Sequence, residues 1–226
     1  MNIVFSIKKI VRGSGFRKKQ KVSFKEWLLM NGPYPPPKEV KQFIIRRLAE
    51  EYGIQTLVET GTYKGEMVYS QFPFFQQIYS IELSKSLFEE CVEKFKKFPN
   101  IKLLQGDSGK VLDQLVPQLS KPSIFWLDAH YSAGITARGD IDCPIEKELE
   151  AVSNSKNLHI IVIDDAKDFV GIDGYPTIEN LKEIVKRVLP MYKFHLVGGI
   201  FFLIPSDYEP SPLVGKMDRK LNLNNS

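Results

Sequence analysis

Short apolar runs alternate with amphipathic segments along most of the chain. The apolar runs have the length of strands and lie at 56–59, 78–82, 101–105, 123–128 and 159–164. Segments of helical period separate them, near 65–71, 84–97, 109–119, 144–153 and 177–189. Strands that are apolar on both faces are typical of a parallel sheet with helices on both sides. The pattern therefore predicts an α/β domain of three layers.

The two ends of the chain follow different patterns. Near the C-terminus, YKFHLV and IFFLIP are joined by Gly198-Gly199, which predicts an antiparallel hairpin at one end of the sheet. Near the N-terminus, the capping box Ser23-Phe-Lys-Glu26 predicts a short helix through Met30, and PYPPP predicts an extended connector to a second helix that ends near Tyr52. We expect three parts: a basic arm, short helix and Pro-rich connector over 1–37, the main domain over 38–206, and a flexible tail over 207–226.

Charge separates the N-terminal arm from the domain. The chain has 226 residues, of which 43% are hydrophobic and 26% charged, as in an ordinary soluble globular protein. Its net charge is +4, but eight Lys and Arg lie in the first 25 residues, without an acid among them. The rest holds 23 basic and 27 acidic side chains, so no broad nucleic-acid surface is expected there. The arm is expected to be solvated or to make a weak contact with an anionic membrane surface.

The two cysteines, Cys91 and Cys143, have the spacing of neither a metal site nor a disulfide framework. A reducing, cytoplasmic location is therefore expected.

Each of the five predicted parallel strands ends at or beside an acid. In an open parallel sheet the carboxyl ends of the strands form one edge, where ligands bind. Acids gathered there repel one another unless a ligand or a cation offsets their charge. The sequence thus predicts a binding crevice around six residues: Glu59, Glu82, Asp107, Asp128, Asp164 and Asp165.

The turn after the first strand adds a second signal. Gly61 and Gly65 follow Glu59 in ETGTYKG, and Glu82 comes about 20 residues after Gly61, the distance at which an acid meets ribose hydroxyls in nucleotide-binding units. The glycines alone fit a structural turn equally well. Together with Gly106-Asp107-Ser108 after the third strand, they favour a nucleotide-like cofactor.

These motifs and the terminal hairpin resemble those of the class I S-adenosylmethionine-dependent methyltransferases, over roughly residues 40 to 205. The resemblance implies a Rossmann-like sheet of seven strands, mostly parallel, with the last strand antiparallel in a C-terminal hairpin. It implies S-adenosylmethionine as cofactor and a small-molecule acceptor. Glu82 would bind the ribose hydroxyls, and Asp107 and Ser108 would border the adenine. The remaining cofactor residues would be Glu59, Gly61, Thr62, Tyr63, Gly65 and Asp128.

A finer resemblance concerns the fourth and fifth strand ends. Asp128 with Asp164-Asp165 resembles the Mg²⁺ site of the divalent-metal-dependent O-methyltransferases of the catechol and sugar types. Carboxylate oxygens suit Mg²⁺, and a bound cation lowers the pKa of a hydroxyl. The alternative is that Asp128 orients the cofactor while Asp164 and Asp165 cap the next loop.

His130 is the candidate general base, with Asp128 beside it, because its ordinary pKa lies near neutrality. Alternatively, His130 forms hydrogen bonds within its loop. His159 and His195 lie in strand patterns and are interpreted as structural. The loops 131–143 and 168–176 are expected to border the acceptor.

The sequence thus favours an S-adenosylmethionine-dependent enzyme that methylates a hydroxyl of a sugar or other small polar metabolite. One alternative is a nicotinamide-dependent oxidoreductase, which the incomplete glycine fingerprint and the terminal hairpin disfavour. The other is a non-catalytic protein with the methyltransferase fold, which the intact acidic edge disfavours.

Overall fold

A computed structural model describes residues 22–128, 143–172 and 174–221. It contains one seven-stranded sheet with the order β3-β2-β1-β4-β5-β7-β6. The first five strands are parallel, and β7 pairs antiparallel with both β5 and β6. In chain order the strands are β1 Thr56–Thr60, β2 Gln77–Glu82, β3 Ile101–Gln105, β4 Ile124–Leu127, β5 Ile160–Ile163, β6 Tyr192–Val197 and β7 Ile200–Pro205. The predicted α/β, Rossmann-like, mostly parallel sheet with a C-terminal hairpin is confirmed.

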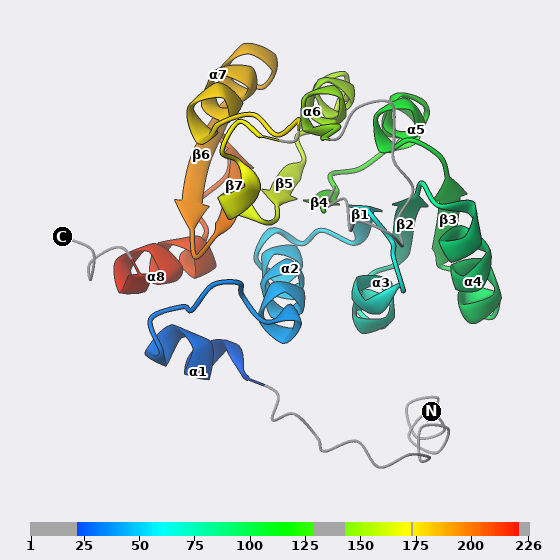
Figure 1. The fold of residues 1–226 in the computed structure, drawn as a ribbon, viewed down its shortest axis with the longest axis horizontal. Helices are drawn as coiled ribbons and strands as arrows, with labels where there is room; N and C mark the ends of the chain where they lie inside the picture. The colour runs from blue at the N-terminus through cyan, green and yellow to red at the C-terminus, as the bar shows by residue number, and fades with distance from the viewer. Residues whose placement is uncertain (1–21, 129–142, 173, 222–226) are drawn as a thin grey trace.

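Helices cover both faces of the sheet (Figure 1). One face carries α1 Phe24–Leu29, α2 Lys38–Tyr52, α3 Glu66–Gln71, α4 Lys85–Phe95 and α8 Pro212–Leu221. The other carries α5 Ser108–Leu115, α6 Ile145–Ser153 and α7 Ile178–Val188. Two short 3-10 turns, η2 Val116–Gln118 and η3 Ala166–Asp168, complete the described elements. The helix positions agree with the sequence pattern, and the Ser23–Glu26 capping box forms as predicted.

The central strands are buried on both sides, which explains their continuous apolar runs. In β4, Ile124 and Trp126 belong to the apolar cluster under α2, whereas Phe125 and Leu127 belong to the cluster under α5, α6 and α7. Successive side chains of a strand point to opposite faces, so a strand between two helix layers needs apolar residues at every position. Trp126 is a core residue, as expected.

The C-terminal segment differs from the predicted flexible tail. Residues 212–221 form α8, whose buried side chains are Leu213, Val214, Met217 and Leu221. Their spacing gives α8 one apolar face, which packs into the same cluster as α1 and α2. Glu51 of α2 accepts hydrogen bonds from the hydroxyl of Ser211 and the backbone N–H of Leu213, and so holds the start of the helix. The prediction of a loose tail is therefore wrong for residues 212–221, because polar flanking residues obscured this apolar face.

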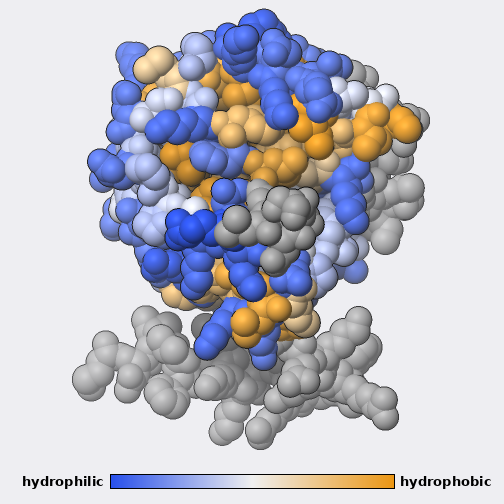
Figure 2. Space-filling model, turned by 90° about the vertical axis from the view of Figure 1, so that its left-hand side faces the viewer, coloured by the Kyte–Doolittle hydropathy of each residue, from blue (hydrophilic) through white to orange (hydrophobic). Residues whose placement is uncertain are grey.

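The outermost strand, β6, lies between α7 and α8. Figure 2 views the molecule from the left of Figure 1, where these elements lie, and shows apolar residues gathered among hydrophilic ones. In the described ranges, every helix is too short or too polar to span a lipid bilayer.

His159 at the start of β5 is fully buried and held by two hydrogen bonds. Its Nδ1 accepts from the backbone N–H of Ser123 at 3.0 Å, so Nε2 carries the proton and donates to the hydroxyl of Ser155 at 2.7 Å. Burial lowers the pKa of His159 to about 4. The structural interpretation of this histidine therefore agrees with its surroundings.

The buried His159 makes the folded state sensitive to acid. Because its pKa is lower in the folded state than in the unfolded chain, stability is full above the ordinary histidine pKa and falls as the pH drops toward about 4. The expected loss is about 1.4 kcal/mol for each pH unit in that window. Urea unfolding of wild type and His159→Gln at several pH values measures it. The variant should be less stable at neutral pH but show a flatter dependence, and equal slopes would contradict the assignment.

Candidate functional site

The strand order places five carboxyl ends side by side at one edge of the sheet. Glu82 of β2 pairs with Gln105 of β3, and Thr60 of β1 lies between Ile81 of β2 and Leu127 of β4. The backbone of Asp164 continues this line by donating a hydrogen bond from N to the carbonyl oxygen of Leu127 at 3.1 Å. The acids at the ends of β1 to β5 therefore share one edge.

The glycine turn after β1 is required by close packing. Gly61 has φ +84°, and a Cβ added to it would lie 2.2 Å from the backbone carbonyl oxygen of Asp128. A Cβ on Gly65, with φ +67°, would lie 2.5 Å from the ring of Phe95 in α4. Only glycine fits both positions. The nearest obstacle to a side chain at Gly61 is therefore the backbone at the end of β4.

Glu82 fixes the conformation of this turn. Its side chain is buried and accepts hydrogen bonds from the backbone N–H groups of Tyr63 at 2.7 Å and Ser84 at 2.8 Å. Tyr63 has φ +48°, so this bond holds a residue in the left-handed region. Each carboxylate oxygen of Glu82 can still accept a further hydrogen bond. The residue predicted to bind ribose therefore also shapes the loop beside it.

Glu59 is buried at the end of β1. Its carboxyl group accepts a hydrogen bond from the hydroxyl of Ser80 at 2.5 Å, and Ser80 is 2.6 Å from the hydroxyl of Thr62. Burial raises the pKa of Glu59 to about 8, the Ser80 hydrogen bond opposes this rise, and the nearby Asp128 and Glu82 add to it. Near neutral pH the group is largely protonated, and a cation arriving beside it would favour the ionised form.

The third strand leads into the N-terminus of α5. Asp107 caps this helix by accepting a hydrogen bond from the backbone N–H of Lys110 at 3.2 Å, and Ser108 is the first helical residue. An additional acid, Glu148 of α6, lies nearby and is fully buried. Burial raises the pKa of Glu148 to about 7, and the hydroxyls of Ser108 and Thr60 partly offset this rise. Neither hydroxyl forms a hydrogen bond of ordinary geometry with the carboxylate.

Glu148 was not among the residues selected from the sequence. A signal for it does exist, because Glu148 lies within the buried face of α6 that includes Ile145, Leu149 and Val152. Acids are rarely found at core positions of a helix, so this pattern could have selected Glu148 as a candidate site residue.

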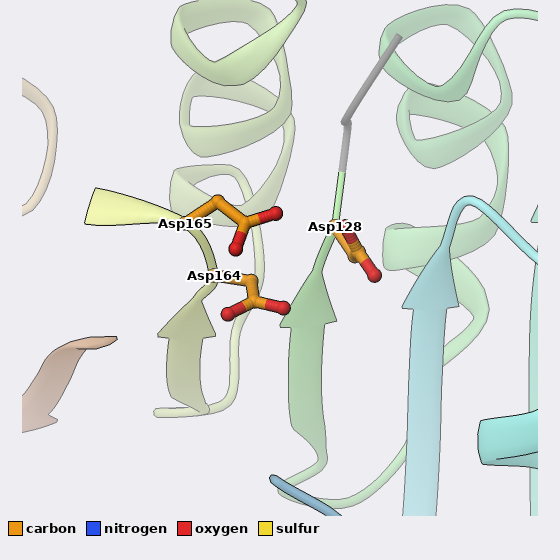
Figure 3. Close-up of side chains that lie close together, drawn as sticks. All are labelled: Asp128, Asp164 and Asp165. Atoms are coloured by element: carbon orange, nitrogen blue, oxygen red, sulfur yellow. The ribbon is translucent and has the colours of Figure 1, made fainter. Parts of the chain in front are cut away.

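Three aspartates gather beside the ends of β4 and β5 (Figure 3). Asp128, Asp164 and Asp165 each offer a carboxylate oxygen, and these oxygens lie within 4.8 Å of one another. Asp165 has φ +52°, which turns the chain sharply after β5. Asp164 is buried, and its Oδ1 has no hydrogen-bond partner among the residues that the structure describes. The donor set fits a hard divalent cation. His130, the predicted base, lies outside the described residues.

A lysine that the sequence did not indicate lies against these aspartates. Lys41 of α2 forms an ion pair with Asp164 and lies 3.4 Å from Asp165. Burial lowers the pKa of Lys41, but Asp164, Asp165 and Asp128 raise it by more, so the group stays protonated. Burial, together with Asp128, raises the pKa of Asp164 to about 7, although Lys41 opposes this rise.

Tyr34, in the predicted extended connector, joins the same cluster. Its hydroxyl donates to Asp165 Oδ1 at 3.4 Å, and the ammonium of Lys167 lies 3.9 Å from its ring centroid. The hairpin turn holds the ring in place, because a Cβ on Gly199 would lie 2.4 Å from it. Burial and the neighbouring aspartates raise the pKa of Tyr34 to about 12.

A small cavity of about 10 Å³ adjoins the aspartates, enough for a group the size of a water molecule. Phe169 and Tyr175, from the predicted wall 168–176, line it together with Cys143 and apolar residues of β4, β5 and α6.

Replacing Gly61 with alanine should destabilise the fold more than a matched change elsewhere. The added Cβ would clash with the backbone of Asp128, so we expect a loss of more than about 2 kcal/mol. Gly53 is the control, because it has φ +64° and no atom of the described residues lies within 4 Å of an added Cβ, and Gly53→Ala should cost about 1 kcal/mol. Chemical denaturation measures both, and equal losses would show that the contact with Asp128 does not matter.

The sequence matches no protein-family model and no curated protein. Solved structures do match. An O-methyltransferase from Bacillus cereus in complex with SAH is 12% identical, with a TM-score of 0.56, over 83% of this chain and 93% of that one. An SAH-bound methyltransferase from Podospora anserina is 15% identical, with a TM-score of 0.53, over 81% and 86%. The O-methyltransferase TomG from Streptomyces achromogenes, in complex with SAM, is 13% identical, with a TM-score of 0.52, over 80% and 89%. The chain therefore has the fold of the class I S-adenosylmethionine-dependent methyltransferases.

Proposed function

We propose that the protein is an S-adenosylmethionine-dependent methyltransferase that methylates a hydroxyl of a sugar or other small polar metabolite. The main support is the acidic edge around the glycine turn, where the buried Glu59 and Glu82 lie at the ends of neighbouring strands and the half-buried Asp107 caps the helix after the third strand. The similar structures from Bacillus cereus and Streptomyces achromogenes, in complex with SAH and SAM, support the same cofactor.

Each half of the cofactor has candidate partners in this proposal. Glu82 binds the ribose hydroxyls, and Asp107 and Ser108 border the adenine. The methionine part lies along the turn beside Glu59, where the positive sulfonium and amino groups offset the negative edge. The remaining assigned residues are Gly61, Thr62, Tyr63, Gly65 and Asp128.

The reaction requires an acceptor oxygen in line with the methyl–sulfur bond and a group that takes the hydroxyl proton. Positioning supplies much of the rate enhancement in such a transfer. Asp128 contacts the turn after β1 and lies beside the aspartates after β5, and we therefore assign it to the junction of cofactor and acceptor. We assign proton removal to His130, two residues further along the chain.

The nicotinamide alternative fits the sheet less well. A dinucleotide-binding Rossmann sheet consists of two parallel mononucleotide-binding halves, whereas this sheet ends in the antiparallel pair β7 and β6.

S-adenosylhomocysteine should stabilise the protein, whereas NAD⁺ and NADH should not. A ligand that binds only the folded state raises the melting temperature, and the increase grows with the logarithm of ligand concentration above the dissociation constant. Glu82→Gln should weaken S-adenosylhomocysteine binding about tenfold or more, because charged acceptors make the stronger hydrogen bonds. Glu93→Gln on the exposed face of α4 makes the same change in charge and should have no effect. Calorimetric titration measures the affinities, and stabilisation by NADH alone would favour the oxidoreductase.

We also propose that Asp128, Asp164 and Asp165 hold Mg²⁺. The clustered carboxylate oxygens support this assignment, as does the Oδ1 of Asp164, which has no hydrogen-bond partner in the described part of the chain. When bound, the cation would lower the pKa of the acceptor hydroxyl. The chain's own contribution is to keep three oxygen ligands at one place on a rigid edge, with Asp164 backed by the backbone of β4.

Asp164→Asn and Asp165→Asn should abolish Mg²⁺-dependent methyl transfer while leaving S-adenosylhomocysteine affinity nearly unchanged. Each substitution removes a charged ligand from the cation but none from the cofactor residues. Asp113→Asn, at an exposed position of α5, is the control and should keep both properties. Methyl transfer to a panel of sugars and catechols, with and without chelator, tests the metal. If chelator does not change turnover, the Mg²⁺ assignment is wrong but the cofactor assignment stands. If the protein binds the cofactor without any turnover, the non-catalytic alternative is favoured.

A further inference from the structure

Lys41 and Lys38 lie one turn apart on α2 but have different surroundings. Lys38 pairs with Glu66 at the surface, and both side chains are more than half exposed. The side chain of Lys41 is only 17% exposed, and that of its partner Asp164 is 2% exposed. Burying a lysine costs free energy that only close carboxylates offset. The position of Lys41 is therefore tied to the three aspartates.

The ammonium of Lys41 contacts two of the three carboxylates that would hold a metal. It contacts Asp164 Oδ2 and lies 3.4 Å from Asp165 Oδ1, within the group whose ligand oxygens span 4.8 Å. A divalent cation bound there would lie close to the ammonium, and like charges at such a separation repel strongly where water is scarce. Lys41 and a metal ion therefore compete for the same carboxylates.

The lysine side chain has the freedom to leave. It has four methylene groups and a compact charge that water solvates strongly. Because the Lys41 side chain is partly exposed, the ammonium can turn outward without moving α2, whereas Asp164 stays fixed at the end of β5.

We propose that Lys41 is a built-in competitor for the divalent metal: its ammonium holds Asp164 in the metal-free protein and must leave that carboxylate when the ion binds. This inference rests on the proposed metal function of the three aspartates. Lys41 thereby keeps the acidic cluster stable without metal and sets the concentration at which the site fills. A residue that served only to stabilise the fold would not affect metal affinity in this way.

The test is the affinity of the full-length chain for Mn²⁺, used as a probe and measured by calorimetric titration and by electron paramagnetic resonance. Lys41→Met removes the competing charge but keeps much of the side-chain volume, and it should bind Mn²⁺ about tenfold more tightly than wild type. Lys38→Met removes a charge from the same helix and should bind like wild type. Unchanged or weaker binding by Lys41→Met overturns the proposal, as does an equal gain in Lys38→Met.

Lys41→Arg covers the case in which Lys41→Met fails to fold. Arginine keeps the charge and forms paired hydrogen bonds with carboxylates, so this variant should bind Mn²⁺ no more tightly than wild type. Tighter binding by Lys41→Arg contradicts direct competition. S-adenosylhomocysteine affinity, measured on the same samples, separates the two proposals. If neither wild type nor Lys41→Met binds Mn²⁺ while S-adenosylhomocysteine still binds, the metal site and the competition fail together and the cofactor assignment stands.

Discussion

Carboxyl groups confined to one edge of a parallel sheet must each find compensation for their charge, and the local structure at this edge follows from that requirement. Glu82 accepts two backbone hydrogen bonds, and the one from Tyr63 holds this residue of the turn before α3 in the left-handed conformation. Glu59 receives one hydroxyl and stays largely protonated at neutral pH. Asp164 receives the ammonium of Lys41. Water would solvate all of these groups in an open chain, so folding replaces that solvation with fixed partners.

Two close approaches of the backbone connect these groups into one site. The carbonyl of Asp128 occupies the space where Gly61 would carry a Cβ, so the ends of β1 and β4 touch. The hairpin turn at Gly199 packs on Tyr34, and Gly199 also accepts a hydrogen bond from the backbone of Ala166. The hairpin thus holds both the connector and the segment after β5 next to the aspartates. The antiparallel end of the sheet contributes to the site without supplying an acid to it.

The sequence was sufficient where the signal is local or periodic. Continuous apolar runs predicted the parallel sheet. The grouping of the strand-end acids at one edge followed from this topology, because the carboxyl ends of parallel strands lie together. The contact between Lys41 and Asp164 could not be predicted from local or periodic patterns. A lysine on an amphipathic helix is usually solvated, and only the packing of α2 over β4 and β5 brings this one to Asp164. The prediction of a loose tail was wrong for a related reason. The apolar face of α8 is short, and the helix needs the surface of α1 and α2 to be stable.

Asp128 connects the electrostatics of the two halves of the edge. Its charge raises the pKa of Glu59 at the end of β1 and that of Asp164 at the end of β5. A cation that neutralises Asp128 from either side therefore favours ionisation of the acid on the other side. Such coupling is reciprocal. If one ligand changes the binding free energy of a second ligand, the second changes the binding free energy of the first by the same amount. In the proposed assignment, a sulfonium cofactor and a cation beside Asp165 would accordingly not bind as independent charges, because Asp128 borders both.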